Sequence, residues 1–228
     1  MFRLREFRPT RPASDRGFTL LETVVALIVL TVGVVATATV AARSMSTSRQ
    51  SKFMALAAEL ATEKIEDLNR WDPGDPQICV PTGSSSVGSL TQDTPLRTTT
   101  CPGGASGTVA YYDDVAVNTV VSGANSPCPS TTYGCLSETM SALSNGSTVY
   151  LTTVHPPSGQ IQTLQNSTPP TSYTFDRRWV IEANPVVNGV TITGARRLTV
   201  LVTLLDTSVY QAGPTYMPIS FQMSIVRP

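Results

Sequence analysis

The strongest pattern in the chain is a long apolar run near its N-terminus. Residues 18–42 contain one charged side chain, Glu22, and no proline. As a helix, this run would be about 37 Å long, which is enough to cross a hydrocarbon core of about 30 Å. Five arginines precede it within residues 1–17, so the positive-inside rule predicts a cytoplasmic N-terminus. We therefore expect one membrane span, with the remainder of the chain outside the cytoplasm.

The helical pattern continues beyond the span. Residues 43–71 lack proline and glycine, and their second half is rich in good helix formers. Glu66 and Arg70 are spaced as an i,i+4 ion pair, and residues 72–74 (Asp-Pro-Gly) predict the end of the helix. Apolar side chains recur every three or four residues, at Phe53, Leu56, Leu60, Ala61, Ile65, Leu68 and Trp71. This amphipathic half is expected to pack against the chain's own globular part.

The C-terminal third alternates between apolar and polar residues with a period of two. Such alternation is typical of strands with one buried face. It occurs in residues 149–154, 173–182, 198–204 and 219–225. These segments predict an antiparallel sheet of about four strands, and the apolar face of that sheet needs a cover. The amphipathic half of the helix can supply it, which gives an α+β fold.

The region between helix and sheet is rich in Ser, Thr, Gly and Pro, and predicts long loops with short strands near 109–112 and 115–121. It also holds all four cysteines of the chain: Cys79, Cys101, Cys128 and Cys135. Outside the cytoplasm, four cysteines imply disulfides, for which three pairings exist. The local pairing, 79 with 101 and 128 with 135, is the one we expect. No Cys-x-x-Cys pair supports zinc.

Composition narrows the range of functions. The chain has 228 residues, 16 bases and 16 acids, so its net charge is zero, whereas nucleic-acid-binding modules usually carry a basic excess. Its one histidine, His155, excludes multi-histidine metal sites, and two prolines after it favour a surface loop. No phosphate-binding loop or HExxH helix occurs. We predict no enzyme, no cofactor and no nucleic-acid partner.

Two further groups of residues invite a chemical interpretation. Asp113 and Asp114 offer carboxylates of the kind that Ca²⁺ uses, but two adjacent acids are too common to predict a site. Two arginine doublets, 177–178 and 196–197, resemble a basic patch. Neighbouring residues on a strand point to opposite faces, so each doublet exposes at most one side chain well. We expect solvated or ion-paired structural roles for these arginines.

Glu22 is the residue that a simple membrane anchor does not explain. A secretory signal peptide has an apolar region of about 7–15 residues, shorter than this run. A carboxylate within an apolar span is unfavourable unless it meets a cation. Cleavage after Gly17 would give Phe18 a free α-amino group, four residues from Glu22. In a packed assembly, the carboxylate of one subunit could then meet the amine of its neighbour.

These residues carry a resemblance. The segment Gly17-Phe18-Thr19-Leu20-Leu21-Glu22, after a basic leader and before an apolar run, resembles the class III signal of type IV prepilins and pseudopilins. The resemblance implies that a prepilin peptidase cleaves after Gly17 and N-methylates Phe18, and that Glu22 acts in assembly. It divides the chain into a leader (1–17), a transmembrane half-helix (18–42), an amphipathic half-helix (43–71) and a disulfide-containing β head (72–228).

A looser resemblance concerns the particular kind of subunit. Residues 55–68, 178–180 and 196–202 are similar to PilV-like pilus modification proteins and to I-type pseudopilins of type II secretion. This implies a minor type IV pilin that primes, caps or modifies a filament. Its expected partners are the inner-membrane assembly platform, the lipid bilayer and other major and minor pilins. A pseudopilin of a secretion or DNA-uptake system is the alternative, and a signal-anchored binding module or enzyme is the third.

Overall fold

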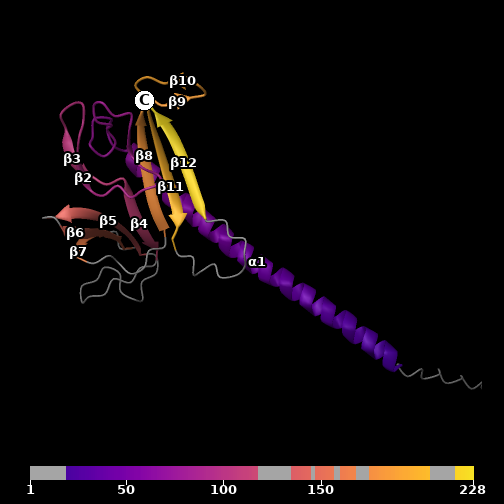
Figure 1. Cartoon of the computed structure of the whole chain (residues 1–228). Helices are drawn as coiled ribbons and strands as arrows, with labels where there is room; N and C mark the ends of the chain where they lie inside the picture. The colour runs from indigo at the N-terminus through magenta and orange to yellow at the C-terminus, as the bar shows by residue number, and fades with distance from the viewer. Residues whose placement is uncertain (1–18, 118–134, 145–146, 157–159, 168–174, 206–218) are drawn as a thin grey trace, which may run out of the picture. The chain divides into compact units, whose positions relative to one another are not determined.

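The computed structural model describes residues 19–117, 135–144, 147–156, 160–167, 175–205 and 219–228. Within these residues the chain forms one long helix, α1 (Leu20–Asn69), followed by strands (Figure 1). The chain divides into two compact units, residues 1–48 and residues 49–228, and the boundary falls inside α1. The described part of the first unit is helical from Leu20 onward, and every residue in it is exposed. The globular part belongs to the second unit.

The second unit is built on one large antiparallel sheet. Its strand order is β12-β11-β8-β4-β5-β6-β7, and β1 pairs with β8 beyond the end of β4. The strands of this sheet are β1 (Ser86–Gly88), β4 (Tyr112–Val117), β5 (Leu136–Ser144), β6 (Ser147–His155), β7 (Gln162–Asn166), β8 (Phe175–Ala183), β11 (Arg196–Leu204) and β12 (Ser220–Arg227). Two hairpins lie outside it: β2 (Arg97–Thr100) with β3 (Ser106–Val109), and β9 (Val186–Val187) with β10 (Val190–Thr191).

The α+β fold is confirmed, but the expected number of strands was too low. The sheet has eight strands, and three of them, β1, β4 and β5, come from the region expected to be mainly loops. The strand expected at 109–112 is instead the junction where β3 ends at Val109 and β4 begins at Tyr112. Residues 118–121 of another expected strand lie outside the described residues. The polar sequence of β5 explains why it was missed.

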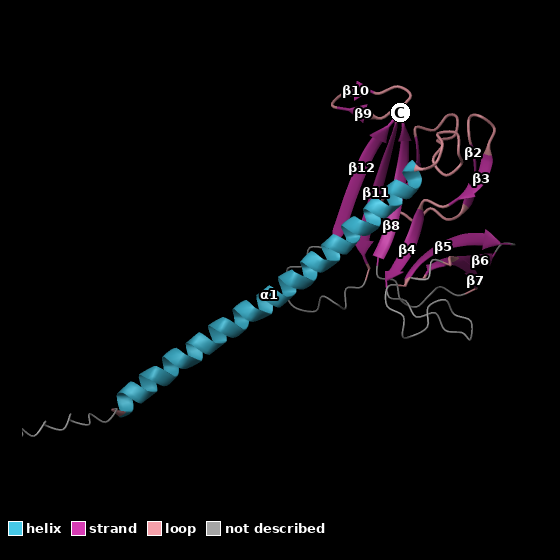
Figure 2. Ribbon diagram, turned by 180° about the vertical axis from the view of Figure 1, so that it is seen from behind, coloured by secondary structure: helices cyan, strands magenta, loops and turns pink. Residues whose placement is uncertain are grey.

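The core lies between the second half of α1 and the sheet, and Figure 2 shows this part of α1 crossing the sheet face. The helix contributes five buried residues: Ala57, Leu60, Ala61, Ile65 and Leu68. The sheet contributes alternate residues of β8 and β11, among them Phe175, Trp179, Ile181, Leu198, Val200 and Val202. The predicted cover for the sheet is therefore confirmed. Thr199, on the other face of β11, is also buried, and its hydroxyl lies 2.8 Å from that of Ser224.

The end of α1 differs in detail from the prediction. The helix ends at Asn69, two residues before Trp71, whose side chain is 41% exposed and outside the core cluster. Arg227, at the end of β12, donates a hydrogen bond of 2.9 Å to the carbonyl oxygen of Asn69. Arg70 pairs with Asp67 at 2.5 Å rather than with Glu66. The Arg227 contact ties the last turn of the helix to the edge strand of the sheet.

One glycine is required by close packing. Gly88 ends β1 with a φ of 82°, a conformation that other residues adopt only with strain. A Cβ at this position would collide with the carbonyl oxygen of Trp179 in β8. Gly83 has a similar φ of 86°, but a Cβ there would meet nothing within 4 Å. The short β1 strand therefore depends on glycine for its approach to β8.

The first of the two expected disulfides is present. Cys79 and Cys101 are bonded, with Cα atoms 5.6 Å apart and 22 positions of separation in sequence. Both side chains are buried, so the bond fastens the segment after α1 to the β2–β3 hairpin. Cys135 is also disulfide-bonded. Cys128 lies outside the described residues, so the 128–135 pairing stays a prediction.

Candidate functional site

The N-terminal site begins at the first turn of α1. Gly17 and Phe18 lie outside the described residues, which start at Thr19. The backbone N–H of Glu22 donates to the side-chain oxygen of Thr19 at 3.3 Å. This is the first half of a capping box, the Thr-x-x-Glu pattern that satisfies free N–H groups at a helix start. A carboxylate in the first turn also suits the positive end of the helix dipole. The backbone of Glu22 thus takes part in a helix cap that sequence reasoning missed, although the Thr-x-x-Glu spacing indicated it.

The apolar part of α1 is exposed in the part of the chain that the structure describes. The most apolar 18-residue stretch of the helix has none of its residues buried, and it meets the length and composition needed to cross a membrane. Four threonines lie in the apolar part, and each hydroxyl donates to a carbonyl oxygen three or four residues earlier: Thr23 to Thr19, Thr31 to Ile28, Thr37 to Val34 and Thr39 to Ala36. Their polar groups are therefore satisfied within the helix, as an apolar environment requires.

A second site lies in the globular unit, around a buried arginine on β8. Period-two alternation places Arg177 on the same face as Phe175 and Trp179, toward α1, and its side chain is fully buried. Its Nε and Nη2 atoms donate to the two carboxylate oxygens of Asp113, at 2.7 and 2.9 Å. Asp113 is also fully buried and is the cross-strand partner of Arg177 on β4. A pair joined by two hydrogen bonds fixes the orientation of the guanidinium as well as its distance from the carboxylate.

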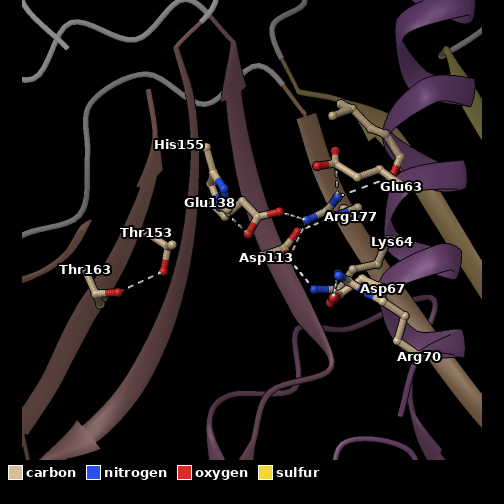
Figure 3. Close-up of polar contacts among 11 residues, drawn as sticks. Glu63, Lys64, Asp67, Arg70, Asp113, Glu138, Thr153, His155, Thr163 and Arg177 are labelled. Carbon is tan, nitrogen blue, oxygen red and sulfur yellow. Dashed lines mark hydrogen bonds and ion pairs between the residues drawn. The ribbon is translucent and has the colours of Figure 1, made fainter. Parts of the chain in front are cut away.

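The buried pair is joined to the helix by two contacts. Arg177 donates through Nη1 to the carbonyl oxygen of Leu60, at 3.2 Å. Lys64, one turn further along α1, places its Nζ 3.2 Å from Asp113 and 4.1 Å from the centroid of the Trp179 ring. Figure 3 shows Lys64 and Arg177 converging on Asp113 from the helix and from the sheet. The network therefore specifies where the helix lies on the sheet.

The network continues across the sheet to β5 and β6. Arg177 also pairs with Glu138 of β5, and Glu138 lies 3.3 Å from Nε2 of His155 (Figure 3). Burial alone would raise the pKa of Glu138, but the hydrogen bond to His155 and the charge of Arg177 outweigh burial and hold it well below its usual value. The hydrogen bond to Glu138 raises the pKa of His155. His155 ends β6 instead of lying in a loop, which corrects the sequence-based expectation.

A cavity of about 540 Å³ adjoins this network. Its lining consists of Glu63, Lys64, Glu66, Asp67 and Arg70 from α1, together with Glu138, His155, Ile161 and Arg177. No group of metal-binding side chains is found among the described residues. The buried charges also compensate one another, since Asp113 and Glu138 balance Lys64 and Arg177. The arrangement is suited to positioning α1 on the sheet and to electrostatic contacts at the rim of the cavity.

The opposite face of the same strands carries a second cluster of charges. Asp114 of β4 and Asp176 of β8 are direct cross-strand partners, and Arg178 bridges Asp176 and Asp93, at 2.6 and 2.8 Å. Burial, followed by repulsion from Asp176, raises the pKa of Asp114 to about 7. Burial also raises the pKa of Asp176 to about 6, although Arg178 opposes this. Because Asp113 and Asp114 point to opposite faces, they do not form a joint calcium site.

Three of the four arginines of the doublets form ion pairs, as expected. Arg177 pairs with Asp113 on one face of β8, and Arg178 pairs with Asp93 on the other face. Arg197, on β11, binds Glu182 of β8 at 2.5 and 2.9 Å. Sequence reasoning did not find that Arg177 is buried. The pattern that could have revealed it is the alternation itself, because Arg177 occupies an inward position between Phe175 and Trp179.

Comparison with known proteins adds one finding. Residues 12–38 match the family model described as the prokaryotic N-terminal methylation motif. No curated protein and no solved structure matches the chain. The motif and the exposed apolar helix together support a type IV prepilin-like protein of the pilin and pseudopilin class. This class implies processing by a prepilin peptidase, assembly with other pilins and a structural role.

Proposed function

We propose that this chain is a minor type IV pilin, a non-catalytic subunit that primes, caps or modifies a filament. The observation that carries the proposal is the match of residues 12–38 to the methylation motif, at the start of a helix whose apolar half is not buried by any of the described residues. An apolar helix of this length needs either lipid or other subunits around it. A filament subunit meets both in turn, first in the inner membrane and then in the assembly.

The proposed processing follows from the motif. A prepilin peptidase removes residues 1–17 by cutting after Gly17 and methylates the new amino group of Phe18. Removing the leader takes away five arginines and two acids, so the mature chain has 11 bases and 14 acids. The inner-membrane assembly platform then receives a subunit whose head lies outside the cytoplasm. The compact head, closed by the Cys79–Cys101 disulfide, suits this environment.

In this proposal Glu22 has an assembly role in addition to its place in the first turn. No lysine or arginine occurs between Phe18 and Ala42, so the span itself offers no cation. The α-amino group of Phe18, on the same chain or on a neighbour, is the nearest candidate partner. A misaligned carboxylate would stay unpaired in an apolar core, which is costly. Pairing with a neighbour's amine would therefore favour one axial register.

Processing is tested by intact-mass analysis of the protein from its own host. We expect loss of residues 1–17 and the addition of one methyl group to Phe18. Gly17→Val should block cleavage, because a bulky side chain prevents close entry of the backbone into the peptidase site. Full-length wild-type protein in the host membrane would contradict the proposal.

The assembly role of Glu22 is tested by two substitutions that separate charge from capping. Glu22→Gln removes the charge but keeps the Thr-x-x-Gln form of the capping box, whereas Glu22→Ala removes both the charge and the capping side chain and keeps only the hydrogen bond from the backbone N–H of residue 22 to Thr19. If the carboxylate sets register, both variants are cleaved and folded but depleted from sheared filaments to a similar extent. Wild-type co-assembly of Glu22→Gln would show that capping alone matters.

The alternative is an I-type pseudopilin of a secretion or DNA-uptake system, because the methylation motif is shared by pilins and pseudopilins. The 157-residue segment 72–228 is large for such a subunit, which favours a pilus. Deletion of the gene distinguishes the two, since a minor pilin changes surface piliation and a pseudopilin changes secretion or uptake. A signal-anchored binding module is disfavoured, since it does not require the methylation motif.

A further inference from the structure

The cavity beside the buried network has no part in the function proposed above. Its volume of about 540 Å³ lies within the range of binding sites for small molecules. One side is formed by residues 63–70 around the end of α1, and the other by β5, the end of β6 and Ile161. Arg177 lies between the two sides, with Glu63 on one side of it and Glu138 on the other (Figure 3). All of these residues belong to the second unit, so the cavity is part of the head.

Two ionisable groups of the lining have shifted pKa values. His155 and Arg177 hold the pKa of Glu138 well below its usual value in spite of burial, and the hydrogen bond to Glu138 raises the pKa of His155. Shifted groups of this kind gather at binding and catalytic sites. The side chains of Glu138 and His155 remain 17% and 32% exposed, so a molecule in the cavity can reach them. The cavity and these groups together define a candidate binding site.

The charge of the lining identifies the class of ligand. Within the described residues, each base of the lining already has an acidic partner: Lys64 has Asp113, Arg177 has Asp113 and Glu138, and Arg70 has Asp67. Glu66 makes no ion pair in the described part of the chain, and Glu63 lies 4.0 Å from Arg177, which is already paired. These two glutamates leave the lining with an excess of negative charge. The cavity therefore suits a cation and disfavours an anion.

The rest of the lining separates an organic cation from a metal ion. Among the described residues, no group of three or more side chains is placed to hold a metal. Ile161 gives the rim an apolar part, and it is 62% exposed. A lysine side chain combines an ammonium group with an apolar methylene stem, and such stems lie along apolar surface while the charge stays in a polar setting. Ile161 and the two glutamates together match both parts of this structure.

We propose that the cavity binds an alkylammonium group, with its charge beside Glu63 and Glu66 and its stem along Ile161. This is the chemistry of a lysine side chain on another protein and of a free aliphatic amine. The inference goes beyond the proposed function and does not depend on it, because every residue involved lies in the head. Exposed ion pairs contribute little free energy each, so the site is expected to bind weakly and to select by charge.

The test is calorimetric titration of the detergent-solubilised full-length chain with Nα-acetyl-lysine N-methylamide. The corresponding glutamine and glutamate derivatives supply a neutral and a negative probe of similar size. Glu63→Gln and Glu66→Gln each remove one negative charge from the cavity. Glu59→Gln is the matched control, because it removes an exposed charge of α1 that does not line the cavity. Thermal unfolding of each variant checks that the head is folded.

The lysine derivative should bind about tenfold more tightly than the glutamine derivative, and each cavity substitution should weaken its binding about threefold. Glu59→Gln should bind it as the wild type does, and the glutamate derivative should bind least. Equal affinities for the three derivatives, wild-type affinity in both cavity variants, or no binding of the lysine derivative would overturn the site.

A second experiment distinguishes the two sources of the amine. A photo-crosslinking amino acid replaces Gln160, an exposed residue next to Ile161, in the full-length chain in its native host. A crosslink to a lysine-bearing peptide of another protein, lost in Glu63→Gln/Glu66→Gln, assigns the cavity to a partner's side chain. No crosslink, with calorimetric binding intact, assigns it to a free amine. A crosslink that persists in the double variant would contradict a lysine side chain as the occupant.

Discussion

The two halves of α1 are one continuous helix, but they differ in how much of their apolar surface is buried. From Leu20 to Ala42 the helix is mainly apolar and carries one charged side chain, Glu22, and every residue is exposed. From Phe53 to Leu68 it buries an apolar face, and it also helps to bury charged groups, since Lys64 and the carbonyl of Leu60 contact Asp113 and Arg177. Among the described residues, none covers the first half. The apolar face of the second half is covered by the sheet, and ion pairs lie inside this contact.

The comparison separates two kinds of evidence for function. Exposed apolar residues in the first half indicate an outside environment, either lipid or neighbouring subunits. Buried charges in the second half indicate positioning, because an arginine without its partners would be very costly in the core. Substitutions in the second half should therefore change stability, and substitutions in the first half should change assembly. The expected effects range from several kcal/mol in the buried network to about 1 kcal/mol at the first turn of α1.

The largest effect is expected from Arg177→Met. It leaves Asp113 buried with only Lys64 as an ionic partner, so the free energy of unfolding should fall by about 3–5 kcal/mol. Arg197→Met is the matched control, because its pair with Glu182 is partly exposed and should be worth about 1 kcal/mol or less. Denaturant titration of the detergent-solubilised chain, followed by Trp179 fluorescence, measures both. Equal losses in the two variants would show that the buried network has no special role.

A smaller loss is expected from Gly88→Ala. The added Cβ would collide with Trp179, and the positive φ would be strained, so the free energy of unfolding should fall by about 3 kcal/mol. Gly83→Ala has the same φ problem in open space and should cost about 1 kcal/mol. The same titration compares them, and a Gly88→Ala loss no larger than that of Gly83→Ala would show that β1 shifts to relieve the clash.

The pH dependence of stability tests the cluster on the other sheet face. Asp114 and Asp176 have raised pKa values in the folded state, so the folded head binds protons more tightly than the unfolded chain. The raised pKa of His155 acts in the same direction, because its contribution is present at low pH and is lost as pH rises through the folded pKa. The lowered pKa of Glu138 acts in the opposite direction, but its contribution is fully present above the pKa of the unfolded chain, near 4.5, so it changes little between pH 8 and pH 5. The Tm should therefore rise by about 3–5 °C from pH 8 to pH 5.

Asp114→Asn should reduce this slope and raise the Tm at pH 8, because it removes the carboxylate whose charge is least favourable there. Glu59→Gln, at an exposed position on α1, should leave the slope unchanged. Thermal unfolding in matched buffers measures all three proteins. An Asp114→Asn slope equal to that of the wild type would assign the pH dependence to other groups.

The smallest effect is expected from Thr19→Val. It removes the acceptor for the Glu22 N–H, so the first turn of α1 should lose about 1 kcal/mol without any change in the head. Hydrogen exchange in detergent should show faster exchange at the Glu22 amide only. Thr31→Val is the control, since the Thr31 hydroxyl bonds within the middle of the helix and its loss should leave the first turn unchanged.

Local pattern was sufficient to predict the helix, its buried face and most of the C-terminal strands, because these depend on residues three, four or two positions apart. The sequence did not predict β5 or the ion-pair network. β5 is largely polar, and it becomes a strand because β4 and β6 pair with both of its edges. The partners of Arg177 lie 39 to 117 positions away, so no local pattern identifies them. The motif at Gly17, Phe18 and Glu22 was predictable because its residues are contiguous.

The central claim is tested most directly by the N-terminal peptide of this chain in sheared surface filaments. Quantitative mass spectrometry of that fraction should find a peptide that begins at N-methylated Phe18, at a level well below that of the major subunit. Such a peptide would show cleavage after Gly17 and incorporation into a filament in the same molecule. A chain confined to the membrane fraction, with residues 1–17 still attached to Phe18, would contradict the account.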